Sequence, residues 1–453
     1  MSFSGSALIR SHSNRNDPAK TQSVLPLIWI VLVALTLRIA VIPFVVDEWF
    51  TPYNLQHYEQ GNVAQALEQG RGFGSPFLSQ QPSAVLPPVY PLLLAGIFKL
   101  LGTHTHASMI AALAMNCLFS ALAVIPVFLV ARRSFSERAA RWAAWAWAFC
   151  PYGIYFAAEW PWPTHLLLLC LCWMLYLAQR MEASSSLTLW AGFGVLAGFA
   201  GLTEPSVLVV VPLLLGLAVA QRIRARVRWA ACALAASLTL AAGLTPWTIR
   251  NAEVFHRFVP LRDSLGLELW LGNNGDSAHW RHGDLHPNHS AAELAEYNRN
   301  GELAFMDHKF QQAESYIQNH PRWYVWMTAR RIAYLWTGYW SFDQSYLREE
   351  PLDPPNIVLT SAMTMLALLG LALAWRERRV DAIRYGGVLF LYPILYALTH
   401  PEAYRMRPLD PLLLVLGCHA IHSLLGARVR REDDDPVAAM GQPSTLYEAG
   451  TAG

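Results

Sequence analysis

The chain has 453 residues, of which 54% are hydrophobic and only 15% are charged, and its formal net charge is +2. A water-soluble protein of this size rarely carries so much apolar composition, so the composition argues against a soluble enzyme and indicates a membrane protein. The small net charge gives no support for nucleic-acid binding through general basic character. All six cysteines fall inside apolar runs, which predicts small core residues rather than disulfides or metal ligands.

Ten apolar segments approach the length of about 20 residues that a helix needs to cross a bilayer. They are residues 24–46, 107–131, 139–157, 164–177, 187–202, 206–220, 229–248, 356–375, 385–399 and 409–425. Residues 1–23 are polar and predict a cytoplasmic lead-in to the first span. Residues 427–453 hold too little apolar content to fold, which predicts a disordered cytoplasmic tail.

The arginines predict the orientation of these spans. They concentrate in alternate connections, at residues 132–141, 222–228, 376–384 and 428–431. Because short cytoplasmic loops are enriched in Lys and Arg, ten spans with the N-terminus inside place every arginine-rich connection in the cytoplasm. The sequence therefore predicts an all-α polytopic membrane helix bundle over residues 24–426. Two long loops, about 47–106 and 250–355, are then extracytoplasmic.

The apolar stretch at residues 87–101 is too short to cross the membrane and begins with two prolines. Counting it as a span would invert every later loop. We therefore predict an interfacial or re-entrant helix that packs on the bundle, within the first external loop.

Three carboxylates of the first external loop are candidate general bases. Asp47 and Glu48 come where the first span leaves the hydrocarbon, and a partly desolvated carboxylate at that boundary suits proton abstraction. Glu59 shares a helix face with Val63 and Leu67, at four-residue spacing, and should be drawn against the bundle. The alternative is that all three are solvated acids at a span end or on a helix surface.

Basic residues outside the membrane are scarce and are candidate phosphate ligands. Tyr404, Arg405 and Arg407 come directly before the last span, and a guanidinium at the bilayer surface suits bidentate contact with a lipid phosphate. A second basic cluster follows the seventh span and consists of Arg250, His256, Arg257 and Arg262. Ordinary anchoring to lipid headgroups is the alternative for both groups.

The second external loop holds candidate contacts for a sugar or an acceptor. Trp270 and the amide pair Asn273 and Asn274 offer an aromatic face and hydrogen bonds, which sugar rings require. The same residues are typical of a tight turn. Four histidines follow, at positions 279, 282, 286 and 289, and their mixed spacing favours solvated side chains over a metal site. We predict neither a metal nor a cofactor.

The chain resembles the GT-C superfamily, in particular membrane glycosyltransferases related to dolichyl-phosphate-mannose protein mannosyltransferases and bacterial lipid A aminoarabinose transferases. The resemblance covers about residues 35–425. It rests on the acidic exit of the first span and on four stretches in a fixed order: YEQGNVAQALEQGRGF (58–73), LPPVYPLLLAGIFKLLG (86–102), PWTIRNAEVFHRFVPLRDSLGLELWLGNN (246–274) and YRMRPLDPLLL (404–414).

The resemblance implies a polyprenyl-phosphate-linked sugar donor, a glycan, lipid or protein acceptor on the extracytoplasmic side, and inversion at the anomeric carbon. A first-loop acid would deprotonate the acceptor, and Arg side chains would hold the phosphate. By position the base would be Asp47, with Glu48 adjacent. Asp47 lies eleven residues before Tyr58, farther than the simplest family pattern allows, so Glu59 is a rival.

Two other functions remain open. A secondary transporter suits ten spans, although transporters usually place ionisable residues near the midplane of the membrane. A polymerase or ligase of lipid-linked glycans would share the compartment and the lipid phosphate. The expected location is a bacterial inner membrane, with the active site facing the periplasm or exterior.

Overall fold

A computed structural model describes residues 25–77, 81–278, 285–339, 341, 343–349, 353–400 and 403–433. These residues form α-helices and short 3-10 helices, and the described part of the chain has no β-strand beyond an isolated bridge between Gly74 and Pro82. The predicted all-α class is confirmed. The predicted N-terminal lead-in, and the predicted tail beyond Asp433, lie outside the described residues.

Seven helical segments of the described chain are long and apolar enough to cross a membrane. They are built from α1 (Leu25–Ile39) with α2 (Ile42–Val45), α6 (His106–Leu122) with α7 (Val124–Ser134), α10 (Thr164–Met181), η3 (Pro205–Val210) with α12 (Val211–Arg224), α13 (Ala230–Phe255), α19 (Asp353–Glu377), and η5 (Ala403–Leu409) with α22 (Asp410–Asp433). Each overlaps one predicted span. The protein is an integral membrane helix bundle.

The other three predicted spans are shorter or broken helices. α11 (Leu187–Gly201) has 15 residues, and the 139–157 segment divides into α8 (Glu137–Ala148) and α9 (Pro151–Glu159). Cys150 adopts an extended conformation because the following proline disfavours the helical region. The 385–399 segment divides similarly into α20 (Arg379–Leu391) and α21 (Ile394–Leu398). The count of ten spans stays a prediction.

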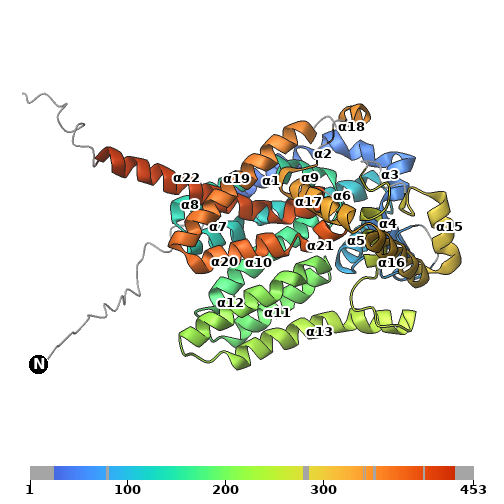
Figure 1. The fold of residues 1–453 in the computed structure, drawn as a ribbon, viewed down its shortest axis with the longest axis horizontal. Helices are drawn as coiled ribbons and strands as arrows, with labels where there is room; N and C mark the ends of the chain where they lie inside the picture. Colours follow the sequence, from blue (N-terminus) through green and yellow to red (C-terminus); the bar gives the residue numbers. More distant parts are fainter. Residues whose placement is uncertain are drawn as a thin grey trace, which may run out of the picture.

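The bundle has two distinct ends (Figure 1). The connections from α7 to α8 and from α19 to α20 lie at one end, and the helices of the two long loops gather at the other. These helices are η2 (Val46–Phe50), α3 (Pro52–His57), α4 (Glu59–Glu68), α5 (Val89–Leu101), α14 (Leu265–Gly272), α15 (Ala291–Asn300), α16 (Glu302–Asn319), α17 (Pro321–Thr337) and α18 (Gln344–Glu349). We call this end of the molecule the external region, after the side of the membrane that the sequence predicts for it.

A buried arginine ties α1 to its neighbours. Arg38 is fully buried, and its guanidinium donates to Oγ of Ser120 on α6 and to the carbonyls of Trp147 and Ala148 on α8. A guanidinium inside a membrane bundle needs such partners because lipid provides none. These bonds fix the helix from which the first external loop emerges.

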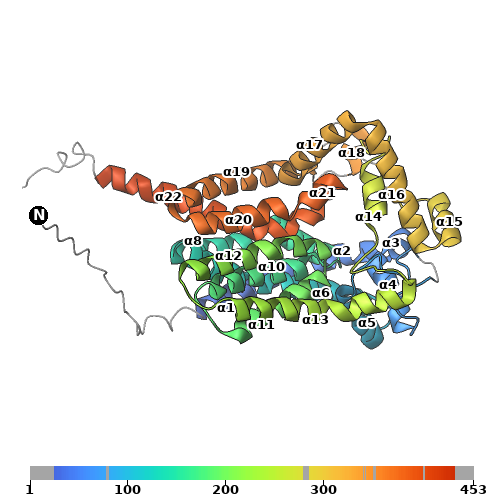
Figure 2. The ribbon, with the colours of Figure 1, turned by 60° about the horizontal axis from the view of Figure 1, so that its bottom comes forward.

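The two external loops share a small apolar core of their own. Val63 of α4 and Phe77 pack with Leu267 and Leu271 of α14 and with Tyr297 of α15. Figure 2 shows α14 beside α16, on the side of the external region away from α5. This core holds α4 against α14, although about 200 residues separate the two helices in sequence.

Candidate functional site

Two adjoining cavities, of about 310 and 60 Å³, lie in the external region. Five side chains line both: Glu59, Trp162, Arg262, Glu268 and Arg405. They come from α4, from the connection between α9 and α10, from the connection between α13 and α14, from α14 and from η5. The cavities are therefore assembled from both external loops and from the start of the last span.

Glu59 is a largely buried carboxylate at the cavity wall. It is the first residue of α4, and its side chain is 17% exposed. Its Oε1 atom accepts a hydrogen bond of 2.8 Å from Nδ2 of Asn288 and lies 3.5 Å from Nε2 of His286. A carboxylate at a helix N-terminus is also favoured by the helix dipole.

Local packing determines where Glu59 points. The preceding Tyr58 is fully buried and donates its hydroxyl to the carbonyl of Pro161 at 3.2 Å. A Cβ atom at position 61 would lie 2.1 Å from the Tyr58 ring, so the close turn of the chain requires Gly61. Val63 is buried one turn further along the same face. Together these contacts seat the start of α4 on the bundle, as the helical spacing predicts.

Two arginines and a glutamate form a charged wall shared by the cavities. Nη2 of Arg405 lies 3.0 Å from each carboxylate oxygen of Glu268. Arg262 reaches Glu268 at 3.3 Å and Glu204 at 3.5 Å, and Nδ1 of His400 lies 3.7 Å from Glu268. Burial alone would raise the pKa of Glu268, but the charges of Arg405 and Arg262 and the approach of His400 hold it well below its usual range.

This combination of groups offers two kinds of chemistry within one space. Glu59 can accept a proton, and Arg262 and Arg405 can bind an anion such as a phosphate by bidentate hydrogen bonds. An incoming anion would compete with Glu268 for both guanidiniums. The cavity thus suits a reaction in which one group loses a proton and another leaves with negative charge.

Indole rings form another wall of the larger cavity. Trp49, Trp160 and Trp162 line it, and neighbouring rings meet edge to face at centroid distances of 5.6 and 6.1 Å. Nδ2 of Asn116 holds the carbonyls of Trp160 and Trp162 at 2.7 and 3.0 Å. Rigid indole faces suit stacking against the apolar face of a sugar. Sequence reasoning missed these residues, although the run WPWP at 160–163 in an external connection is a usable signal.

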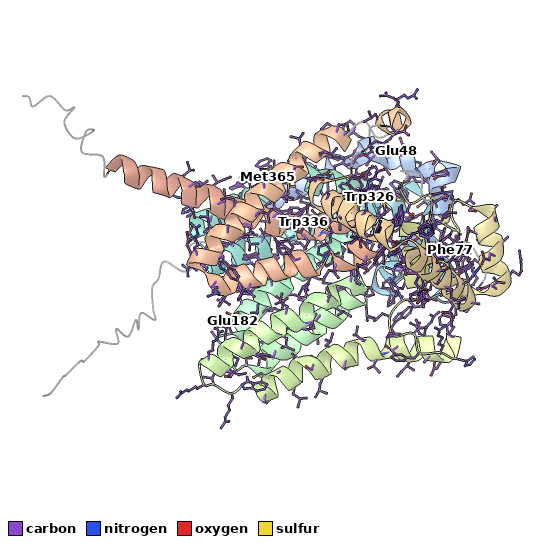
Figure 3. The ribbon with its side chains drawn as sticks, viewed as in Figure 1. Glu48, Phe77, Glu182, Trp326, Trp336 and Met365 are labelled. Carbon is purple, nitrogen blue, oxygen red and sulfur yellow. The ribbon has the colours of Figure 1, made fainter. Side chains whose placement is uncertain are left out.

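The two acids at the end of the first span lie outside the cavities. Asp47 and Glu48 are in η2, and the Asp47 side chain is 85% exposed, with its Oδ1 atom 3.8 Å from Nδ1 of His106. Neither acid lines either cavity. Glu48 is exposed, and Figure 3 shows it apart from Phe77, which lines the larger cavity.

Arg407 points away from the cavities into the bundle. It is buried, lies 3.4 Å from Asp410, and stacks over the ring of Tyr152. This geometry makes it a packing residue of the last span, in contrast to Arg405 two positions earlier. Tyr404 lies in η5, and the position of its side chain is outside what the structure describes.

Arg250 ties the first external loop to α13. Its guanidinium donates to the carbonyls of Ser83 at 2.8 Å and Phe73 at 3.2 Å, and it stacks over the ring of Trp247. It lines neither cavity. Its contacts therefore support the loop rather than a ligand in these cavities.

The predicted sugar contacts belong to the end of α14. Asn273 and Asn274 are buried, and their amides donate to the carbonyls of Leu269 at 2.9 Å and Trp270 at 2.7 Å. Nη2 of Arg331 donates to Oδ1 of Asn273 at 3.0 Å. The amides and Trp270 line neither cavity. They form the turn that ends α14, which is the alternative that the sequence left open.

This turn offers a stability test with a matched pair of glycines. A Cβ atom at position 272 would lie 1.7 Å from the carbonyl oxygen of Thr399, whereas one at position 275 meets nothing. We expect Gly272→Ala to destabilise the protein by roughly 1–3 kcal/mol through overpacking, and Gly275→Ala to change little. Thermal unfolding in detergent would measure both. Equal thermal unfolding midpoints for Gly272→Ala and Gly275→Ala would contradict the close packing of α14 against the end of α21.

The histidine cluster does not behave as one unit. His286 differs from the expected solvated side chain, since it is only 18% exposed and contacts Glu59. His289 is exposed and stacks on His57, while His279 and His282 lie outside the described residues. Within the described residues no group of three or more His, Cys, Asp or Glu is arranged to hold a metal ion. The expected lack of a metal and a cofactor stays a prediction.

Comparison with known sequences supports the resemblance described above. A sequence model of the family described as dolichyl-phosphate-mannose-protein mannosyltransferase matches residues 85–247. These residues run from the apolar stretch before α5 to Trp247 of α13 and include Trp162. No curated protein matches the chain.

Solved structures match the chain at low sequence identity, and two with TM-scores above 0.5 share its fold. The archaeal oligosaccharyltransferase AglB from Archaeoglobus fulgidus, in complex with an inhibitory peptide and a dolichol-phosphate, matches with a TM-score of 0.51 and 13% identity, over 95% of this chain and 53% of that chain. The apo form of the Archaeoglobus fulgidus enzyme matches with a TM-score of 0.52 and 14% identity, over 94% of this chain and 53% of that chain. ArnT from Cupriavidus metallidurans bound to undecaprenyl phosphate has a TM-score of 0.37 and 14% identity, over 93% of this chain and 82% of that chain.

The chain thus spans about half the length of the archaeal oligosaccharyltransferase that it matches. The likeness of fold covers nearly all of this chain, including both external loops. Together with the family match it confirms the predicted resemblance to the GT-C superfamily and the GT-C-like helix bundle.

Proposed function

We propose that this GT-C-like membrane protein is an inverting glycosyltransferase that uses a polyprenyl-phosphate-linked sugar donor and acts on the extracytoplasmic side. The observation that carries the proposal is the shared lining of the two cavities, where Glu59, Arg262 and Arg405 meet. A base and a phosphate anchor in one space are what a single displacement at a sugar phosphate requires. The family match to phosphate-linked mannose transferases supports this choice of donor.

In the proposed reaction an acceptor oxygen attacks the anomeric carbon of the donor sugar. The acceptor loses its proton to the Glu59 carboxylate, and the bond between the anomeric carbon and the phosphate oxygen breaks. The polyprenyl phosphate leaves with an additional negative charge, which Arg405 and Arg262 stabilise. Attack opposite to the leaving group inverts the anomeric configuration.

Glu59 is the proposed base because of its surroundings. It is largely buried, lines both cavities and is held by Asn288. Asp47 and Glu48 project outward, and a base must come within hydrogen-bond reach of the acceptor hydroxyl. For the same reason Arg405 and Arg262 are the proposed phosphate ligands in place of Arg407 and Arg250, and the role of Tyr404 stays a prediction.

A polymerase or ligase of lipid-linked glycans is a second candidate. The specific observation in its favour is that the larger external loop supplies Arg262, Glu268 and Asn288 to the cavity wall. A transporter is less favoured, because the charged side chains that line the two cavities lie in the external region. The size of the product separates the first two functions, since a ligase transfers a chain and the proposed enzyme transfers one sugar.

The experiment uses the purified full-length protein in liposomes with undecaprenyl phosphate carrying one of several single hexoses or pentoses. Envelope extract serves as the acceptor. We expect transfer of one sugar and a product whose anomeric configuration, read by NMR, is opposite to that of the donor. Retention of configuration would reject the single displacement, and failure of every phosphate-linked donor would reject the donor class.

The proposed sidedness is tested with single cysteines, because all six native cysteines are buried and should label weakly. Asn300 at the end of α15 and Arg224 at the end of α12 are both exposed and lie at opposite ends of the bundle. In intact spheroplasts, a membrane-impermeant maleimide should label Asn300→Cys. It should label Arg224→Cys only after permeabilisation. The reverse pattern would place the cavities in the cytoplasm.

A further inference from the structure

The hydrogen bonds of His286 determine which of its ring nitrogens carries a proton. The backbone N–H of Asn288 donates to Nδ1 of His286 at 3.2 Å. A backbone N–H can only donate, so Nδ1 is unprotonated, and in the neutral ring the proton is on Nε2. The Nε2–H group then lies 3.5 Å from Oε1 of Glu59 and donates toward it.

The turn that carries His286 is held in place. The carbonyl of His286 accepts the backbone N–H groups of His289 at 2.9 Å and Ser290 at 3.0 Å, which closes the turn. The ring of Phe77 meets the His286 ring edge to face, at a centroid distance of 5.2 Å. The imidazole therefore has little freedom to rotate away from Glu59.

Asn288 supplies a second donor from the same turn. Its Nδ2 atom donates to the same oxygen of Glu59 at 2.8 Å, while its backbone N–H holds the His286 ring. A carboxylate with two donor groups aimed at one of its oxygens is favoured in its charged form, which is the form that a base needs. The other charged or titratable groups on the walls around Glu59 fall into three sets. Arg262, Glu268 and Arg405 line both cavities, Glu204, Tyr392 and Tyr396 line the smaller one, and Tyr53, His57, His289 and His400 line the larger one.

We infer that His286 and Asn288 are positioning residues that keep the Glu59 carboxylate charged and aimed into the cavity. In this arrangement His286 acts as a neutral donor. It takes no proton from Glu59, because Nε2 already carries one and Nδ1 is occupied by the backbone of Asn288. This inference rests on the proposed function and adds the groups that make Glu59 a competent base.

The test measures the pH dependence of kcat/KM with the undecaprenyl-phosphate sugar that the wild-type protein accepts. We expect His286→Phe, which keeps a ring but removes the donor, to lower kcat roughly ten- to a hundredfold. The acidic limb of its profile should move up by about one pH unit, while KM for the donor changes little. His286→Gln, whose amide can donate from a similar position, should restore most of the wild-type kcat and return the acidic limb close to its wild-type position.

Asn288→Leu provides an independent variant and should move the acidic limb in the same direction. His320→Gln, at an exposed histidine that caps the C-terminal end of α16, is the matched control and should behave as wild type. Size-exclusion profiles in detergent verify that each variant is folded.

The possible outcomes separate the two proposals. If Glu59→Gln is inactive and His286→Phe keeps the wild-type acidic limb, the inference is wrong and the proposed function stands. If His286→Gln is as slow as His286→Phe, a donor at this position is not what matters, and the inference is again wrong. If Glu59→Gln retains transfer, the proposed base is wrong and the role of His286 falls with it.

Discussion

Replacing Glu59 by Gln is expected to lower sugar transfer at least a hundredfold, because the amide cannot accept the proton of the acceptor hydroxyl. Gln keeps the shape of the side chain, and its carbonyl oxygen can still accept a hydrogen bond from Asn288. The substitution therefore removes the base with little change in packing. Donor binding should stay close to wild type, since the phosphate contacts lie on other residues. Initial rates and donor binding in liposomes measure the two effects separately.

Asp47→Asn and Glu48→Gln are the matched controls for this prediction. Both acids are exposed and outside the cavities, so each variant should keep transfer within a few-fold of wild type. A large loss in Asp47→Asn with an active Glu59→Gln would return the role of base to the end of the first span. It would also require the external region to rearrange when substrate binds, because Asp47 does not line the cavities.

Replacing Arg405 by Ala should lower kcat/KM by roughly a hundred- to a thousandfold, because it removes a charge-assisted contact to the leaving phosphate. It also leaves Glu268 without the cation that approaches both of its oxygens, which adds repulsion between that carboxylate and the donor. Arg405→Lys should recover only part of the loss, since an ammonium keeps the charge and loses the bidentate geometry. Steady-state kinetics with varied donor concentration and with varied acceptor concentration would show whether the loss lies in use of the donor or of the acceptor.

Arg257→Ala is the control for the loss of an external arginine. Arg257 is exposed and pairs with Asp307 at 2.6 Å, away from the residues that line the cavities. Such a surface pair contributes little, so transfer should be nearly unchanged. If Arg405→Ala instead alters acceptor preference and leaves donor use intact, Arg405 does not bind the phosphate.

The membrane character and class of the fold followed from the sequence, because both depend on local composition. A stretch of about 20 apolar residues is sufficient to predict a span, and the arginine-rich connections predict the orientation. The segment at 139–157 shows the limit of this reasoning. Its apolar content predicts one span, whereas Pro151 divides it into α8 and α9. A proline effect on the backbone is local, but its outcome depends on what the two pieces pack against.

The arrangement of the candidate site could be predicted only in part. Helical spacing places Glu59 on a buried face, and the position of Arg405 before the last span makes it a candidate phosphate ligand. The same reasoning ranks Arg407 beside Arg405, because it cannot tell which of two nearby side chains turns inward. Contacts with Asp410 and with the ring of Tyr152 turn the Arg407 side chain into the bundle. Tyr152 is distant in sequence, so its contact could not be predicted from the residues near Arg407.

The sequence by itself determined that this is a membrane helix bundle with two long loops between its spans, and it supplied the candidate acids and arginines. Only the tertiary structure decided which of them meet. Glu59 contacts Asn288 across 229 positions, and Arg405 contacts Glu268 across 137. The physical reason is that such contacts form only when segments far apart in the sequence pack together, as residues of α4 and α14 do in the shared apolar core of the external region, and no local pattern of either segment encodes that packing.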